Sequence, residues 1–177
     1  MKRIFFLVIL IILVLIFQLN ILYFISSLSS LINPFLIIAV LLLLLYDLKI
    51  SFFWVLVGAF LIDIYSINFF GLYLITYVLT IYVANFFFKR FFTNRSLYSF
   101  IIISMIATIS YFVFLAGFSQ LFYYIHISPY SLRLDHIFFL SVLYQTMINA
   151  FIMGLAYFIA LYVSDHLKAN FIFKKQF

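Results

Sequence analysis

The chain has 177 residues, of which 69% are hydrophobic and 8% charged, and its formal net charge is +6. A soluble domain is roughly half apolar and about one quarter charged, so this composition excludes a water-soluble domain and indicates an integral membrane protein. The basic residues lie in short segments between apolar runs and at the termini, which favours a positive-inside bias over binding to nucleic acid.

The apolar runs predict helices rather than the strands of a membrane barrel. Runs such as 4–17 and 35–46 are apolar on every side, whereas barrel strands alternate apolar and polar residues. We therefore expect an all-α integral membrane protein, with one polytopic domain over residues 1–177 and a bundle of about six transmembrane helices. The expected helices are 4–25, 34–46, 50–64, 71–88, 97–118 and 137–163.

The first apolar run follows Met1-Lys2-Arg3, which resembles the start of a secretory signal. The run continues past Gln18 and Asn20 to residue 25, which is longer than a typical signal core, so we expect an uncleaved first helix. After a serine-rich loop, Pro34 suits the first turn of the second helix, where its missing N–H is not needed. That second helix contains five consecutive leucines and no row of small residues, so we expect it to face lipid or a partner.

The second and third helices are joined by Asp47-Leu48-Lys49 and are predicted to form a tight antiparallel hairpin. Both are near the lower length limit for a span. A re-entrant pair is the alternative, but it would bury Asp47 and Lys49 at depth, where ionisable groups are costly. Full crossing is favoured for this reason.

The fourth helix ends at the densest basic cluster, Lys89, Arg90 and Arg95, which we expect to form a cytoplasmic loop. Ser96, or the neighbouring Thr93 or Asn94, suits the N-cap of the fifth helix. With six crossings, nine basic residues fall on one side and only Arg133 on the other, so both termini are expected in the cytoplasm. The nine are Lys2, Arg3, Lys49, Lys89, Arg90, Arg95, Lys168, Lys174 and Lys175.

Asp63 is the sharpest candidate site residue, because an acid inside a membrane helix is a functional hypothesis by default. Counting from Lys49 at about 1.5 Å per residue puts it about 20 Å from the cytoplasmic boundary, nearer the outer surface than the midplane. One interpretation is an acid at a helix end that reaches interfacial water or caps the neighbouring break. The other is a buried residue that binds a partner or lines a cavity. Backbone groups of residues 66–71 or a tyrosine hydroxyl are its expected partners.

Four ionisable residues gather in the last outer loop: His126, Arg133, Asp135 and His136. Their spacing matches no known metal-ligand motif, so a metal site is disfavoured. An interfacial polar loop and a contact surface for an extracytoplasmic partner both remain open.

Small and polar residues recur at helical spacing on three predicted helices and indicate the bundle interior. Gln145 and Asn149 are the largest of them, and they are alternatively suited to receive the transmembrane helix of a partner or to line a cavity. The rows are Thr76, Thr80 and Ala84; Ser104 and Thr108; and Gln145 and Asn149.

No constellation for catalysis is visible in the sequence. The chain has no cysteine, and its four acidic residues are all aspartates that do not pair along the sequence. No nucleophile stands with a base, and no phosphate-binding loop is present. We therefore expect a protein that is not an enzyme and that holds no cofactor or metal.

The segment GAFLIDIYSINFFG at residues 58–71 ends an apolar helix in Leu-x-Asp, breaks, and opens the next helix at a glycine. Together with the basic KRFFTNRSLYSF that follows, up to residue 100, it resembles the central signature of the rod shape-determining protein MreD family. The resemblance assigns Asp63 and Gly71 as signature positions. Phe70 stands where the family usually has a proline.

The resemblance implies a non-catalytic subunit of the bacterial cell-elongation machinery in the cytoplasmic (inner) membrane. Such subunits bind the bitopic protein MreC and, with MreB, RodA and a penicillin-binding transpeptidase, organise peptidoglycan synthesis and rod shape. The alternative is a vitamin-binding component of an energy-coupling-factor transporter, which has similar size and helix count. That family tends to carry an Ala-x-x-x-Ala face on its first helix, whereas residues 4–25 contain no alanine or glycine.

Overall fold

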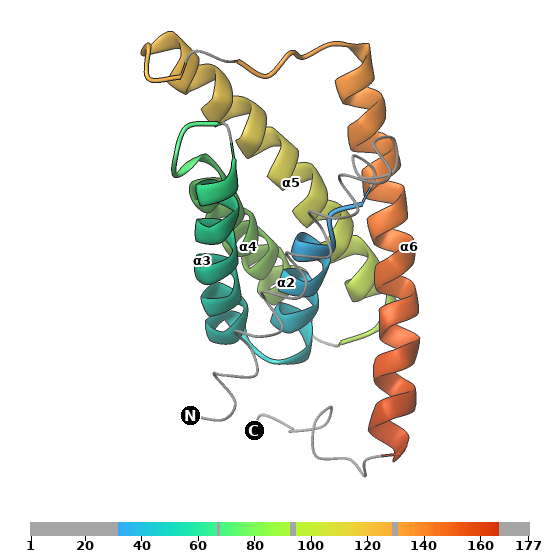
Figure 1. Cartoon of the computed structure of the whole chain (residues 1–177). Coiled ribbons are helices and arrows are strands. Elements are labelled where there is room, and N and C mark those ends of the chain that lie inside the picture. The colour runs from blue at the N-terminus through green and yellow to red at the C-terminus, as the bar shows by residue number, and fades with distance from the viewer. Residues whose placement is uncertain (1–31, 67, 93–94, 129–130, 167–177) are drawn as a thin grey trace.

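The computed structural model describes residues 32–66, 68–92, 95–128 and 131–166, and all regular structure within these ranges is helical (Figure 1). The expected first helix at 4–25 lies outside the described residues. The described helices are α2 (Pro34–Leu45), α3 (Leu48–Tyr65), α4 (Leu72–Phe91), α5 (Leu97–Tyr124) and α6 (His136–His166).

Four of these helices, α3 to α6, are long and apolar enough to cross a membrane. Helix α2 has 12 residues and a length of about 18 Å, well below the roughly 30 Å of a hydrocarbon core. The structure therefore supports a helical membrane bundle in which four of the described helices can span. It does not support six spanning helices. A long apolar run is not by itself a full crossing, since the helix ends where the chain turns at Tyr46 and Asp47.

Helix α3 begins at Leu48 instead of residue 50, so Lys49 lies in the helix and not in the connection, and α6 ends at His166 instead of residue 163. The ends of α4 and α5 differ as well. Helix α4 continues to Phe91, so Lys89 and Arg90 form its last turn instead of a loop. Helix α5 has 28 residues and continues to Tyr124, which shortens the polar connection expected before α6. In both cases apolar and aromatic residues extend the helix beyond the point where the first polar residue appears. Positive charge in a last turn is also favourable near the negative end of the helix dipole.

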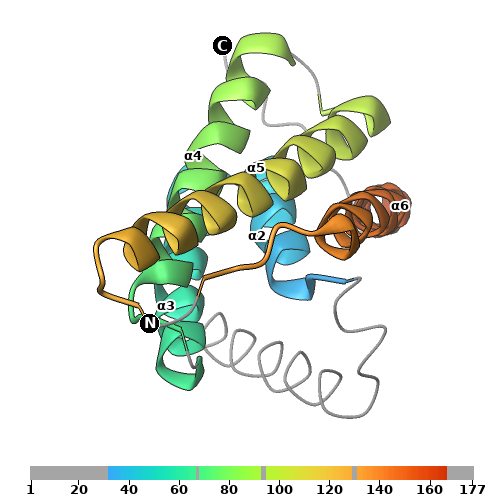
Figure 2. The ribbon, with the colours of Figure 1, turned by 90° about the horizontal axis from the view of Figure 1, so that it is seen from above.

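Helix α2 lies at the centre of the bundle, and α3, α4, α5 and α6 all pack against it (Figure 2). Eight of its 12 residues are buried: Phe35, Leu36, Ile37, Ala39, Val40, Leu42, Leu43 and Leu44. The prediction that this helix faces lipid or a partner was wrong. A uniformly apolar helix carries no polar face, and the protein interior and the lipid are both apolar, so its sequence cannot distinguish the two.

The contact between α2 and α3 depends on the absence of a side chain at Gly58. The ring of Phe35 fills this position so closely that a Cβ atom there would overlap its Cε2 and Cζ atoms. The same ring stacks on Trp54 with centroids 5.8 Å apart and meets Tyr77 edge-on at 4.9 Å. The Ser51 hydroxyl also donates to the Ala39 carbonyl at 2.7 Å, which holds the two backbones together.

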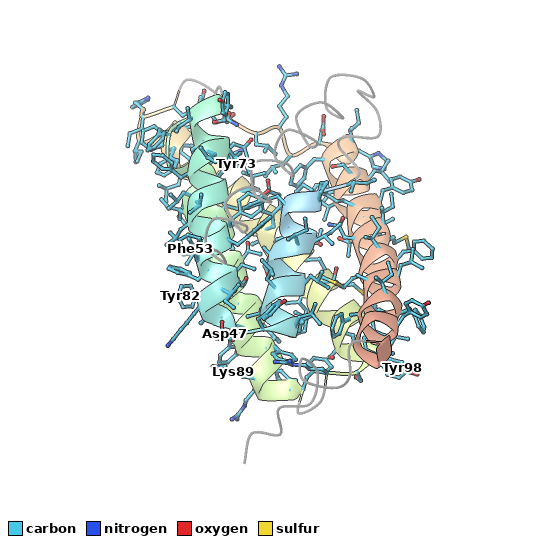
Figure 3. All side chains as sticks on the ribbon, turned by 60° about the horizontal axis from the view of Figure 1, so that its bottom comes forward. Asp47, Phe53, Tyr73, Tyr82, Lys89 and Tyr98 are labelled. Carbon is cyan, nitrogen blue, oxygen red and sulfur yellow. The ribbon has the colours of Figure 1, made fainter. Side chains whose placement is uncertain are left out.

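Most of the described basic residues lie at one end of the bundle (Figure 1). The α2–α3 and α4–α5 connections lie at one end, together with Lys49, Lys89, Arg90 and Arg95. The α3–α4 and α5–α6 connections lie at the other end, with Arg133. Figure 3 shows Asp47 and Lys89 toward the first end and Tyr73 toward the second.

We predict that Gly58→Ala destabilises the bundle by about 1–3 kcal/mol, because the added methyl group forces Phe35 out of its position between α2 and α3. Gly117→Ala is the matched control, since apart from its chain neighbours and the backbone of its own helix no atom lies within 4 Å of a Cβ built at Gly117. Denaturant titration of the purified protein in detergent, followed by circular dichroism, measures both. Equal stability of the two variants would contradict the packing described for Gly58.

Candidate functional site at the α3–α4 turn

Asp63 lies in the last turn of α3 with 3% of its surface exposed, and its carboxylate binds the first turn of α4. Its Oδ1 accepts the backbone N–H of Tyr73 at 3.0 Å, and its Oδ2 accepts that of Leu74 at 2.9 Å. These are two of the N–H groups that have no partner within their own helix. The negative charge also lies at the positive end of the α4 dipole. Asp63 therefore caps α4 from the preceding helix.

Gly71 explains why the cap comes from another helix. Gly71 is the N-cap residue of α4, it has no side chain to accept a hydrogen bond, and its φ of +98° is a conformation that other residues rarely adopt. The turn is closed from the α3 side, where the backbone N–H and the hydroxyl of Ser66 both donate to the Asp63 carbonyl at 3.3 Å. Asp63 and Gly71, which the resemblance assigned as signature positions, thus both form the capped start of α4.

This geometry agrees with the interpretation of Asp63 as an acid that caps the break after its helix. Its partners are the backbone groups of Tyr73 and Leu74, just beyond the expected range of 66–71. Both carboxylate oxygens are committed to backbone N–H groups. The arrangement is suited to fixing the angle between α3 and α4.

Asn33 performs a similar task at the start of α2. Its Oδ1 accepts the N–H of Leu36 at 3.0 Å, and its Nδ2 donates to the Tyr77 hydroxyl on α4 at 2.9 Å. The Tyr77 ring in turn lies 4.8 Å from that of Tyr111 on α5. The sequence analysis assigned no role to Asn33, although an asparagine directly before a proline is a recognisable N-cap signal.

Arg95 closes the other end of α2. Its Nη1 donates to the carbonyl of Leu45 at 2.8 Å, and its Nη2 donates to that of Tyr46 at 3.1 Å. The two carbonyls belong to the last turn of α2, where a positive charge is favourable. Lys89 and Arg90 are exposed at the end of α4. The basic cluster expected as one loop therefore divides into a pair in the last turn of α4 and one exposed residue, Arg95, that binds α2.

The predicted interior rows are all buried, including Thr76, Thr80, Ala84, Ser104, Thr108, Gln145 and Asn149. Their hydroxyls mostly bond within their own helix: Thr76, Thr80 and Thr108 donate to carbonyls four residues earlier, at 2.7 to 2.9 Å. The bond between the Asn149 amide and the Thr108 hydroxyl, 3.1 Å long, crosses from α6 to α5. Small side chains here serve mainly to let the helices approach each other.

The loop between α5 and α6 is anchored to α5. The Leu132 N–H donates to the Ser119 hydroxyl at 3.0 Å, and the Gln120 amide donates to the Leu132 carbonyl at 2.8 Å. Asp135 caps α6 by accepting the Phe138 N–H at 3.0 Å, directly before His136. Arg133 is exposed.

His126, with a φ of +59°, is one of five residues that line a hollow of about 420 Å³. The others are Tyr123, Tyr124, Ile127 and Ser128. Within the described ranges, no group of three or more histidine, cysteine or acidic side chains lies close enough to hold a metal ion.

Comparison with known proteins returns no match among family models, curated proteins or solved structures. The likeness to the MreD family therefore rests on the residues at 58–100 alone.

We predict that Asp63→Ala destabilises the protein by about 1–3 kcal/mol, because it leaves the N–H groups of Tyr73 and Leu74 without partners in an apolar setting. Asp63→Asn should lose part of this amount, since a carboxamide offers one oxygen to two donors. The unfolding free energy in detergent is the measurement. Asp47→Ala removes a similar cap on the exposed end of α3, where water replaces it, and a loss as large as that of Asp63→Ala would contradict our account.

We predict that Arg95→Ala destabilises the protein by about 0.5–1.5 kcal/mol, because the last carbonyls of α2 lose two charge-assisted donors. Arg95→Lys should recover only part of the loss, since an ammonium is a point charge and does not reproduce the planar fork. Arg90→Ala removes an exposed charge from the end of α4 and serves as the control. The same titration compares the three variants, and equal losses at residues 90 and 95 would rule out a specific role for Arg95.

Proposed function

We propose that this protein is a non-catalytic membrane scaffold subunit of the bacterial cell-elongation machinery. In this proposal it binds an MreC-type bitopic membrane protein and helps to organise lateral peptidoglycan synthesis and rod cell shape. The observation that carries the proposal is the commitment of both Asp63 oxygens to the backbone of α4, at the glycine-opened turn on which the resemblance rests.

A capping role for Asp63 supports a protein that acts through its shape. Among the acidic residues whose side chains the structure describes, Asp63 is the buried one, and its hydrogen bonds go to the N–H groups of Tyr73 and Leu74. A carboxylate that transfers a proton or binds a ligand must lie within hydrogen-bond reach of that group, and no described pocket is lined by Asp63. Asp63 instead fixes α3 relative to α4 within their hairpin, which maintains the shape that a surface for other proteins requires.

The distribution of charge supports an orientation for this scaffold. Lys49, Lys89, Arg90 and Arg95 lie at one end of the described bundle, and basic residues favour the cytoplasmic side. We therefore propose a multi-pass protein of the bacterial cytoplasmic membrane with both termini in the cytoplasm. The exposed Lys89 and Arg90 would then meet MreB, RodA, a penicillin-binding transpeptidase or anionic lipid headgroups.

Depletion of the protein in its host, combined with affinity capture from detergent-solubilised membranes, tests the proposal. We expect depleted cells to lose their rod shape and the captured protein to bring an MreC-type partner with it. Asp63→Ala should reduce capture in proportion to the loss of folded protein, and Asp47→Ala should leave it unchanged. Normal cell shape on depletion, or a vitamin that co-purifies in stoichiometric amount, would overturn the scaffold proposal.

A further inference from the structure

Three exposed basic side chains lie at one end of the α3–α4 hairpin. Lys49 is in the first turn of α3, and Lys89 and Arg90 are in the last turn of α4. The acidic Asp47 stands beside Lys49 in the sequence, and its Oδ1 accepts the Ile50 N–H at 3.0 Å as the cap of α3. Positive charge is therefore in excess at this end of the hairpin.

These three side chains differ from Arg95, which lies at the same end of the bundle. Arg95 donates to two carbonyls of α2 and so has a role inside the protein. The side chains of Lys49, Lys89 and Arg90 make no hydrogen bond or ion pair with the described part of the chain. Their charges are available to a ligand from outside.

Exposed aromatic side chains continue from these cations along the same two helices. On α4, Phe86 and Tyr82 lie four and eight residues before Arg90, so the three share one face of the helix. The two rings are 62% and 49% exposed. On α3, Phe53 lies four residues after Lys49 and is 37% exposed. Each helix thus carries a row that begins with a cation and continues with rings toward the middle of the span.

The two rows lie side by side and run in opposite chain directions. The rings of Phe52 and Tyr82 are in contact, with centroids 5.7 Å apart, and this contact sets the register of α3 against α4. Figure 3 shows Phe53 and Tyr82 on one side of the bundle and Lys89 toward the basic end. Measured from the ring contact, Lys49 lies about 4.5 Å and Lys89 about 10.5 Å closer to that end. Packed helix axes are about 8–10 Å apart, so the two long side chains can converge on one phosphate.

The pattern is complementary to an anionic phospholipid. Such a lipid has a phosphate at the membrane border and acyl chains below it, as the rows have cations at their end and rings below. Phe91 and Tyr98, which are 66% and 73% exposed at the same end, are typical of residues at that border. A soluble protein could contact the cations, but it would not reach rings that lie within the span. Lys89 and Arg90 also suit a phosphate, as a point charge and a planar fork.

We propose that the α3–α4 hairpin holds an anionic phospholipid, whose phosphate lies between Lys49, Lys89 and Arg90. Its acyl chains lie along the exposed rings of Phe53 and Phe86. This inference narrows the partners proposed for Lys89 and Arg90 to lipid, and it does not depend on the scaffold role.

Quenching of tryptophan fluorescence by brominated lipid tests the site. Phe86→Trp places a reporter in the row on α4, and Phe139→Trp places one at an equally exposed ring, also 62%, at the other end of the bundle. The natural Trp54 is the only tryptophan of the chain, and at 1% exposure it adds the same background to both. Each protein is reconstituted in phosphatidylcholine vesicles with an increasing fraction of brominated phosphatidylglycerol. The quenching curve gives the preference for phosphatidylglycerol over phosphatidylcholine at the reporter.

We expect a preference of about tenfold at Phe86→Trp and of less than about twofold at Phe139→Trp, because each basic residue at the surface contributes up to about fivefold. Adding Lys89→Gln and Arg90→Gln to the first reporter should lower its preference below about twofold. Arg133→Gln is the matched control, since it removes an exposed charge from the other end and should leave the preference at Phe86→Trp unchanged.

The outcomes are distinct. Equal preference at the two reporters would mean a general attraction by the net charge of +6 and would overturn the site. A preference that survives the double substitution at residues 89 and 90 overturns it as well. No preference at Phe86→Trp would assign the basic pair to a cytoplasmic protein and would also overturn it. Loss of partner capture with the lipid preference intact supports the lipid site and contradicts the scaffold proposal alone.

Discussion

Helix ends in an apolar bundle must find partners for their backbone groups, because little water is available there to supply them. This requirement accounts for the main polar contacts of the described structure. Asn33 caps the start of α2, Asp63 caps the start of α4, and Arg95 binds the last carbonyls of α2. Each of these side chains is polar or charged, and each is committed to backbone atoms. Their positions decide where the helices begin and end.

The short central helix makes this requirement more severe. An α2 of 12 residues that is surrounded by four other helices has at least one end away from the membrane surface. Its N-terminal end is held by Asn33 and through it by Tyr77, and its C-terminal end by Arg95. Its side chains supply the core against which the longer helices pack, with Phe35 seated at Gly58. Capping and packing thus act on the same helix.

Because these side chains bind the backbone of helix ends, fewer residues of the described part of the chain are available for function. The ionisable residues that resemble a site, Asp63 and Arg95, stabilise helix ends. Among the residues that remain available are the exposed Lys89 and Arg90, the aromatic hollow around His126, and the apolar faces of the helices that point away from the core. Such surfaces suit contacts with proteins and lipid, which agrees with the scaffold that we propose.

The sequence by itself determined the membrane class, the helical architecture and several local features. It predicted Pro34 in a first turn, Gly71 and Ser96 at helix starts, and the buried rows of small residues, because these depend on neighbours within one helix. Only the tertiary structure placed α2 at the centre, since an interior and a lipid environment select the same apolar residues. It alone also revealed that Arg95 binds Leu45 across 50 positions and that Asp63 reaches Tyr73 across ten. A side chain that caps another helix leaves no periodic signal in the sequence, because its partner is a backbone group that every residue carries.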